Sequence, residues 1–151
     1  MTHRQSMPGQ WLIIELQPGH EEWEALGNLA RGSGVILLEP LGRKDRRPLS
    51  RFASAHGLSL IVDRQGAVAR VHNQPELTKA LLRRTSLILV SPIHSTRSHP
   101  DWKPLPRMRA ATLARLAGRR AVALGGMNGQ RFAKIAPLGF IGWAGISAFR
   151  T

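Results

Sequence analysis

The chain has 151 residues, of which 42% are hydrophobic, a share that suits one folded domain and excludes a disordered segment. It has no cysteine, which excludes disulfides and thiolate metal sites, and no apolar run near the roughly 20 residues of a membrane helix. Lysine and arginine total 22 against 9 acidic residues, and the formal net charge of +13 favours anionic partners. We expect one soluble, cytoplasmic domain spanning residues 1–151, because the N-terminal residues also lack the apolar core of a signal peptide.

Short apolar runs alternate with amphipathic segments along the chain. The runs, which predict strands, occupy residues 11–16, 34–39, 58–63, 67–72, 86–91, 121–126 and 139–146. Several are apolar at successive positions, which is typical of strands buried on both faces of a parallel sheet. The segments between them, which predict helices, occupy residues 21–32, 47–57, 74–84, 105–118 and 128–139.

Two predicted helices have capping residues in the sequence. Asn73 can cap a helix in which Pro75 suits the first turn and Glu76 complements the positive helix end. Asn128 and Gly129 can open a later helix in a similar way.

The alternation of strands and helices indicates an α/β fold, either an open doubly wound sheet or a (β/α)8 barrel. The chain is short for a barrel, which seldom has fewer than about 200 residues. Only Arg64, Gln65 and Gly66 separate two of the strand candidates, whereas a parallel crossover needs about ten residues or more. These two runs therefore form a hairpin, are one bent strand, or mark a deletion.

Polar and glycine-rich segments follow the last three strand candidates. "SPIHSTRSHP" offers hydroxyls and basic side chains after residues 86–91, and either binds an anion or is a solvated turn. Gly125 and Gly126 follow "AVAL" and either bring backbone N–H groups close to an anion or serve a tight turn. We expect Trp11, Trp23 and Trp143 in the core, and Trp102 either in a surface loop or packed over a ligand.

Together, "SPIHSTRSHPDW", "AVALGGMN" and "GFIGWAGISAF" resemble the C-terminal half of thiamine phosphate synthases and the related TenI-type thiazole tautomerases. The resemblance covers residues 86–149 and is weaker in the N-terminal half. It implies a (β/α)8 barrel and a Mg²⁺-assisted reaction that joins hydroxymethylpyrimidine pyrophosphate to thiazole phosphate and releases pyrophosphate. The expected partners are therefore phosphorylated pyrimidine and thiazole small molecules, with no membrane, and nucleic acid is kept only as an alternative.

The resemblance also implies site residues. The pyrophosphate side falls to Thr96, Ser98 and His99, where His99 replaces the family's lysine. The thiazole phosphate falls to Gly125, Gly126, Ile146 and Ser147. Arg43 and Lys44 are the candidates for cations that neutralise the leaving group, and Asp63 is the candidate Mg²⁺ ligand.

The family's fourth-strand segment, which supplies a metal-binding aspartate, is absent and would fall at residues 64–66. We therefore predict an abridged TIM-type barrel of about seven parallel strands with outer helices, lacking one βα unit between Asp63 and Ala67. Because an unclosed barrel leaves strand edges bare, an exposed seam or a homodimer contact should compensate. Mg²⁺ should bind weakly or not at all, because hard cations need several oxygen ligands.

The resemblance therefore implies a thiamine phosphate synthase-like protein, either active or inactive. One alternative is a catalytically degenerate phosphate-ligand-binding relative or a thiazole tautomerase. A second alternative is a basic nucleic-acid-binding module, although a chain with 5% aromatic residues and no tyrosine has few base-stacking platforms.

Overall fold

The fold is built on one curled, parallel sheet. The computed structural model describes residues 7–38, 41–64, 66–96 and 100–149. Within them the strands are β1 (Gln10–Ile14), β2 (Gly34–Leu37), β3 (Ser59–Val62), β4 (Val68–Val71), β5 (Leu87–Val90), β6 (Ala121–Leu124) and β7 (Gly142–Gly145). All six neighbouring pairs are parallel, and the seven strands lie in the order β3-β2-β1-β7-β6-β5-β4. Each predicted strand is confirmed.

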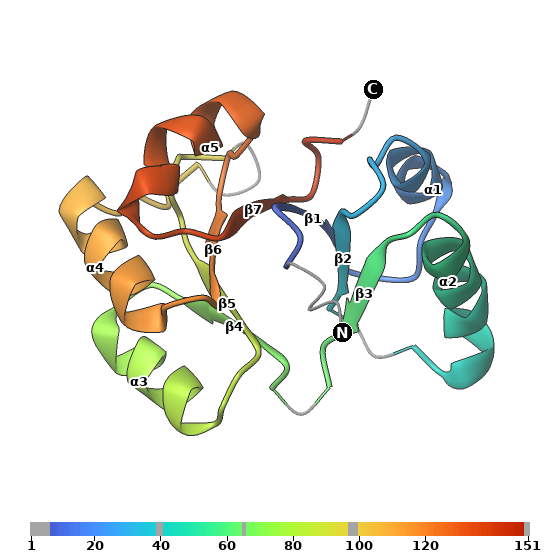
Figure 1. The fold of residues 1–151 in the computed structure, drawn as a ribbon, viewed down its shortest axis with the longest axis horizontal. Helices are drawn as coiled ribbons and strands as arrows, with labels where there is room; N and C mark the ends of the chain where they lie inside the picture. The colour runs from blue at the N-terminus through green and yellow to red at the C-terminus, as the bar shows by residue number, and fades with distance from the viewer. Residues whose placement is uncertain (1–6, 39–40, 65, 97–99, 150–151) are drawn as a thin grey trace, which may run out of the picture.

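Helices cover the outer side of the sheet. Those in the described ranges are α1 (His20–Gly27), α2 (Arg43–Ala55), α3 (Gln74–Leu82), α4 (Arg107–Ala117) and α5 (Gly129–Ile135), the last followed by a short 3-10 turn, Ala136–Leu138. In Figure 1, α1 and α2 flank β1, β2 and β3, while the other helices flank β4 to β7. All five predicted helices are present, although α1 ends earlier than predicted and α2 starts earlier.

The predicted caps are confirmed. The Asn73 side chain accepts a hydrogen bond from the Glu76 backbone N–H at 2.9 Å, and the Asn128 side chain accepts one from the Arg131 N–H at 2.9 Å. Each cap satisfies one of the backbone donors that a helix start leaves without an intrahelical partner.

The strand order is that of a (β/α)8 barrel with one strand missing. Consecutive strands are neighbours on each side of the gap, and β7 closes back onto β1, as the last strand of a barrel does. Among the described strands, the order is interrupted between β3 and β4, which form the two edges of the sheet. The abridged TIM-type barrel is therefore confirmed, the doubly wound sheet is excluded, and the hairpin between residues 58–63 and 67–72 is wrong.

A five-residue link, residues 63–67, joins the two edge strands. The described residues of this link lie at the open side of the curl, away from the helix-covered face, as Figure 1 shows. Five residues can span roughly 17 Å, whereas a four-residue strand is about 13 Å long, so this short link can reach the start of β4. The Ala67 N–H donates to the Arg64 carbonyl at 3.3 Å, and the Ala67 carbonyl accepts from Leu87 at 3.1 Å.

The inner side of the curl is packed with apolar side chains. Its buried members are Trp11, Ile13, Ile36, Val68, Leu87, Leu89, Val122 and Ala144. Trp11 is 1% exposed, and its ring occupies the space where a Cβ on Gly34 would stand, 2.1 Å from the ring carbon Cε3. The inside of the curled sheet is therefore a filled core, as in complete barrels.

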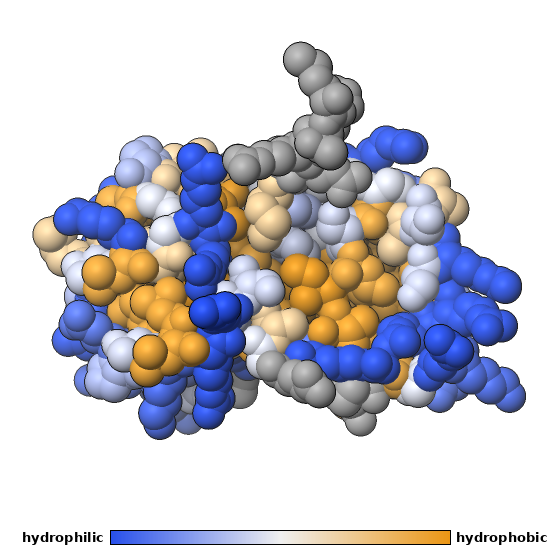
Figure 2. Space-filling view, turned by 60° about the horizontal axis from the view of Figure 1, so that its bottom comes forward, coloured by the Kyte–Doolittle hydropathy of each residue, from blue (hydrophilic) through white to orange (hydrophobic). Residues whose placement is uncertain are grey.

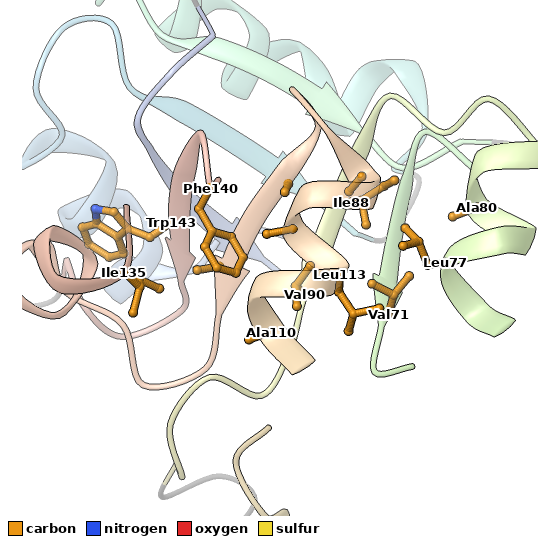
Figure 3. Close-up of a cluster of buried hydrophobic side chains, with 14 of the residues drawn as sticks. Val71, Leu77, Ala80, Ile88, Val90, Ala110, Leu113, Ile135, Phe140 and Trp143 are labelled. Atoms are coloured by element: carbon orange, nitrogen blue, oxygen red, sulfur yellow. The ribbon is translucent and has the colours of Figure 1, made fainter. Parts of the chain in front are cut away.

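Two further clusters lie between the sheet and its helices. One packs β1, β2 and β3 against α1 and α2, and Trp23 is partly buried against it. The other packs β4 to β7 against the remaining helices and includes Val90, Leu113, Phe140 and Trp143, shown in Figure 3. The prediction of a core location is confirmed for Trp11 and Trp143, whereas Trp23 lies at the margin.

The open side of the barrel leaves apolar side chains at the surface. All four residues of the edge strand β3 are only partly buried. Figure 2 shows hydrophobic residues in two areas of one face, with hydrophilic residues between and around them. A homodimer across this side stays a prediction. None of the helices in the described ranges has the length and apolarity needed to cross a membrane.

Candidate functional site

A cavity of about 600 Å³ lies at the carboxyl ends of the strands. Five of the residues predicted from the sequence line it, namely Thr96, Gly125, Gly126, Ile146 and Ser147. They come from the segments that follow β5, β6 and β7, which are neighbours in the sheet. In TIM barrels the segments that follow the strands at this end form the active site.

The loop after β5 runs alongside the turn after β6. The Ile93 N–H donates to the Leu124 carbonyl at 3.0 Å, and the His94 N–H donates to the Gly125 carbonyl at 3.1 Å. Gly125 has φ 112° and Gly126 has φ 57°, both in the left-handed region. A Cβ on Gly125 would lie 2.9 Å from the Ile93 nitrogen, so the close approach of the loop requires a glycine there.

Arg131 and His94 flank this turn. Arg131 lines the cavity, and its Nη1 donates to the Gly126 carbonyl at 2.5 Å. The pKa of His94 is lowered from its ordinary value of 6.5, chiefly by burial and further by the charges of Arg131 and Lys134. The imidazole is therefore mainly neutral near pH 7, and the positive charge beside the glycine turn belongs to Arg131.

The segment after β7 forms the next part of the wall. Ile146 and Ser147 line the cavity, and two contacts hold the chain beyond them. The Phe149 ring stacks on Trp143 at 5.1 Å, and the Asn28 side chain donates to the Phe149 carbonyl at 3.3 Å. Ser147 itself is exposed to solvent, so its hydroxyl can meet a ligand.

On the β4 and β5 side, His72 fixes the start of the loop. Its Nδ1 lies 2.7 Å from the Ser91 carbonyl oxygen, which can only accept, so Nδ1 carries a proton and donates. Ser91 is buried and lines the cavity, and Trp102 lines it as well, with its ring 6.1 Å from that of His72. Trp102 thus lies in an exposed loop that also lines the cavity, and its packing over a ligand stays a prediction.

Several residues of the wall were not expected from the sequence, chief among them Glu15, Arg70, Ser91 and Arg131. The sequence contains one indication that Arg70 lies at a site. It interrupts the predicted strand "AVARVH", and an arginine within a strand of a covered sheet has to reach an edge, a pocket or solvent. Glu15, Ser91 and Arg131 carried no comparable signal, because polar residues just beyond strands and on helices are ordinary.

Other predicted residues do not lie at the cavity. Arg43 and Lys44 are exposed in the first turn of α2 and do not line it. Asp63 lies in the link after β3, where its carboxylate accepts a hydrogen bond from the Val68 N–H at 3.3 Å. Ser98 and His99 fall outside the residues that the structure describes.

The described donor set does not fit Mg²⁺. Glu15 is the one carboxylate among the described residues that line the cavity, and two guanidinium groups share the wall with it. Nowhere in the described ranges do three or more histidine, aspartate or glutamate side chains gather as they would around a metal ion. Mg²⁺ needs several oxygen ligands, and nearby cations oppose its binding.

Comparisons with known proteins support the fold. No family model matches the sequence, and no curated protein matches it. Among solved structures, a thiamine phosphate pyrophosphorylase from Pyrococcus furiosus is similar with a TM-score of 0.70 and 13% sequence identity, over 95% of this chain and 88% of that chain. At this identity the likeness shows the fold alone. The chain is a curled half-barrel of the TIM type, with seven parallel strands and outer helices.

Proposed function

We propose that this protein is a thiamine phosphate synthase-like transferase that binds phosphorylated pyrimidine and thiazole molecules in the cavity at the carboxyl ends of β5, β6 and β7. One observation carries the proposal. Thr96, the two glycines, Ile146 and Ser147 come from three separate segments whose roles follow from the sequence resemblance, and all of them line one cavity.

The proposed reaction needs no proton donor. The bond between the pyrimidine methylene carbon and the pyrophosphate oxygen breaks, and the pyrophosphate leaves with the electron pair. The thiazole nitrogen then gives its lone pair to the methylene carbon and forms the new C–N bond. Thr96 would donate a hydrogen bond to the leaving pyrophosphate, while the Gly125 turn and Ser147 would hold the thiazole phosphate and orient its nitrogen.

The test is formation of thiamine phosphate from the two substrates, followed by mass spectrometry, with and without added Mg²⁺. Ser147→Asp places a negative charge in the cavity wall and should abolish product formation, because it repels the phosphate. Ser50→Asp makes the same change on the exposed surface of α2 and is the matched control, expected to behave as wild type. Absence of product from folded wild-type protein would refute the transferase proposal.

A second candidate is a relative that binds thiazole phosphate without transferring the pyrimidine, as a ligand-binding protein or a tautomerase does. The direct link between β3 and β4 favours it, since the resemblance assigns a metal-binding aspartate to the unit that is missing there. This candidate predicts that thiazole phosphate raises the melting temperature of wild type, and not that of Ser147→Asp, while no thiamine phosphate forms.

A further inference from the structure

We propose that Arg70 is the cation of a metal-independent diphosphate site on the β4 side of the cavity. The inference deepens the proposed function, because that function supplies the diphosphate-bearing ligand. The site itself is defined by Arg70 and is tested with inorganic pyrophosphate alone.

Arg70 faces the inside of the curl. Side chains alternate along a strand, and its neighbour Val68 belongs to the inner cluster, whereas Ala69 and Val71 pack against the outer one. Arg70 pairs in register with Leu89 of β5, which is also an inner residue. Its side chain lines the cavity together with Ser91 and Thr96. The guanidinium therefore lies on the same wall as the hydroxyl assigned to the pyrophosphate side.

The charge of Arg70 is not neutralised within the described part of the chain. Arg70 is exposed and makes no hydrogen bond or ion pair with any described residue. The strand side chains around it on the inner face are apolar, including Leu87, Leu89 and Val122. A cation on a concave, low-dielectric wall concentrates its field in the cavity, which favours an anionic ligand there.

The guanidinium fork is chemically suited to a diphosphate. Its parallel N–H donors bind two phosphate oxygens at once, and it stays charged at every physiological pH. Across the cavity Arg131 is bonded to the Gly126 carbonyl, which leaves Arg70 as the unpaired cation of the described wall. Arg70 can thus neutralise charge on a leaving diphosphate, the task that a divalent cation performs in sites rich in carboxylates.

An arginine on an edge strand can also have a purely protective role. β4 is an edge of the sheet, and inward-pointing charges on edge strands discourage pairing with other chains. That role predicts aggregation when Arg70 is replaced and no change in pyrophosphate affinity. The two roles can therefore be separated by measuring binding and oligomeric state on the same variants.

The experiment is isothermal titration of inorganic pyrophosphate, in EDTA and in excess Mg²⁺, with monodispersity and melting temperature checked for each protein. The variants are Arg70→Gln, which removes the charge, and Arg70→Lys, which keeps the charge and loses the fork. Arg83→Gln is the matched control, since Arg83 is exposed at the end of α3, at the amino end of the sheet. It corrects for non-specific attraction to a chain of net charge +13.

The proposal predicts that wild type and Arg83→Gln bind pyrophosphate equally well in EDTA. Arg70→Gln should bind about tenfold more weakly or worse, and Arg70→Lys should fall between, because a bidentate charged hydrogen bond is lost. Equal affinity of Arg70→Gln and Arg83→Gln would overturn the proposal, as would wild-type binding that requires Mg²⁺. Failure of thiamine phosphate formation beside Arg70-dependent binding would remove the transferase function and leave this site standing.

Discussion

The carboxylate of Asp63 accepts a hydrogen bond from the backbone N–H of Val68 at 3.3 Å, so one side chain spans the link between the two edge strands. The bond satisfies an N–H at the start of β4, which is an edge strand of the sheet formed by the described residues. The family resemblance assigns Asp63 to metal binding. In the structure its side chain instead bridges the short link that replaces the missing unit.

We expect Asp63→Ala to lower the free energy of unfolding by about 1 kcal/mol, the usual net contribution of one such hydrogen bond. Asp63→Asn keeps an acceptor oxygen and should cost less. Urea denaturation of the three proteins measures both effects. If instead Asp63→Ala leaves stability unchanged and abolishes a Mg²⁺-dependent rise in melting temperature, Asp63 is a metal ligand and not a structural residue.

The contact between Gly34 and the Trp11 ring predicts a steric penalty inside the barrel. A Cβ on Gly34 would lie 2.1 Å from the ring, so Gly34→Ala should cost about 1–3 kcal/mol, as overpacked cores do. Gly27→Ala, where a Cβ meets nothing within 4 Å, is the control. Combining Gly34→Ala with Trp11→Phe should cost less than the sum of the two single changes, and strict additivity would contradict this packing.

Gly126→Ala tests the turn at the cavity. Alanine is disfavoured at φ 57°, and its Cβ would stand 3.0 Å from both the His94 Cβ and the Ser95 carbonyl oxygen. We expect a loss of about 1–2 kcal/mol in stability from the left-handed conformation. Gly129→Ala, three residues later and without such contacts, should be neutral or stabilising in denaturation experiments. Equal effects of the two substitutions would show that the turn does not require Gly126.

His94 should make stability depend on pH. Burial and the charges of Arg131 and Lys134 lower its pKa in the folded state, so between that pKa and 6.5 the unfolded chain binds more protons. The contribution of the neutral His94 side chain to the free energy of unfolding is then full above pH 6.5. It is lost as the pH falls toward the folded-state pKa. Unfolding of wild type and His94→Gln measured from pH 7.5 to 5 should show a shallower decline in the variant. Parallel curves would refute this account of His94.

Much of the fold is predictable from the sequence, because buried parallel strands are apolar at successive positions. "SLILVS" and "WLIIEL" are such runs, and both contain strands. The three residues between two of the runs located the missing unit from length alone. Length alone could not distinguish a hairpin, a bent strand or a deletion at this gap, because the answer depends on the curl of the whole sheet, which brings β3 and β4 within reach of a short link. The prediction of a deletion came from the family resemblance.

The candidate site was only partly predictable, for a different reason. Thr96, Gly125 and Ser147 lie in segments with recognisable residue patterns, so their proximity could be expected. Arg70 and Arg131 line the same cavity through strand alternation and helix placement, which short patterns do not show. Arg43 and Lys44 had the right chemistry and lie in the first turn of α2, away from the cavity.

The most direct test of the central claim is a titration of the isotope-labelled protein with thiazole phosphate, followed by backbone amide NMR. We expect saturable shifts for the amides of Gly125, Gly126, Ile146 and Ser147, with no comparable shifts in the arginine-rich first turn of α2. Ser147→Asp should remove these shifts, and Ser50→Asp should preserve them. Absence of shifts at the cavity, or shifts confined to exposed arginine-rich segments, would contradict the claim that this cavity binds a phosphorylated ligand.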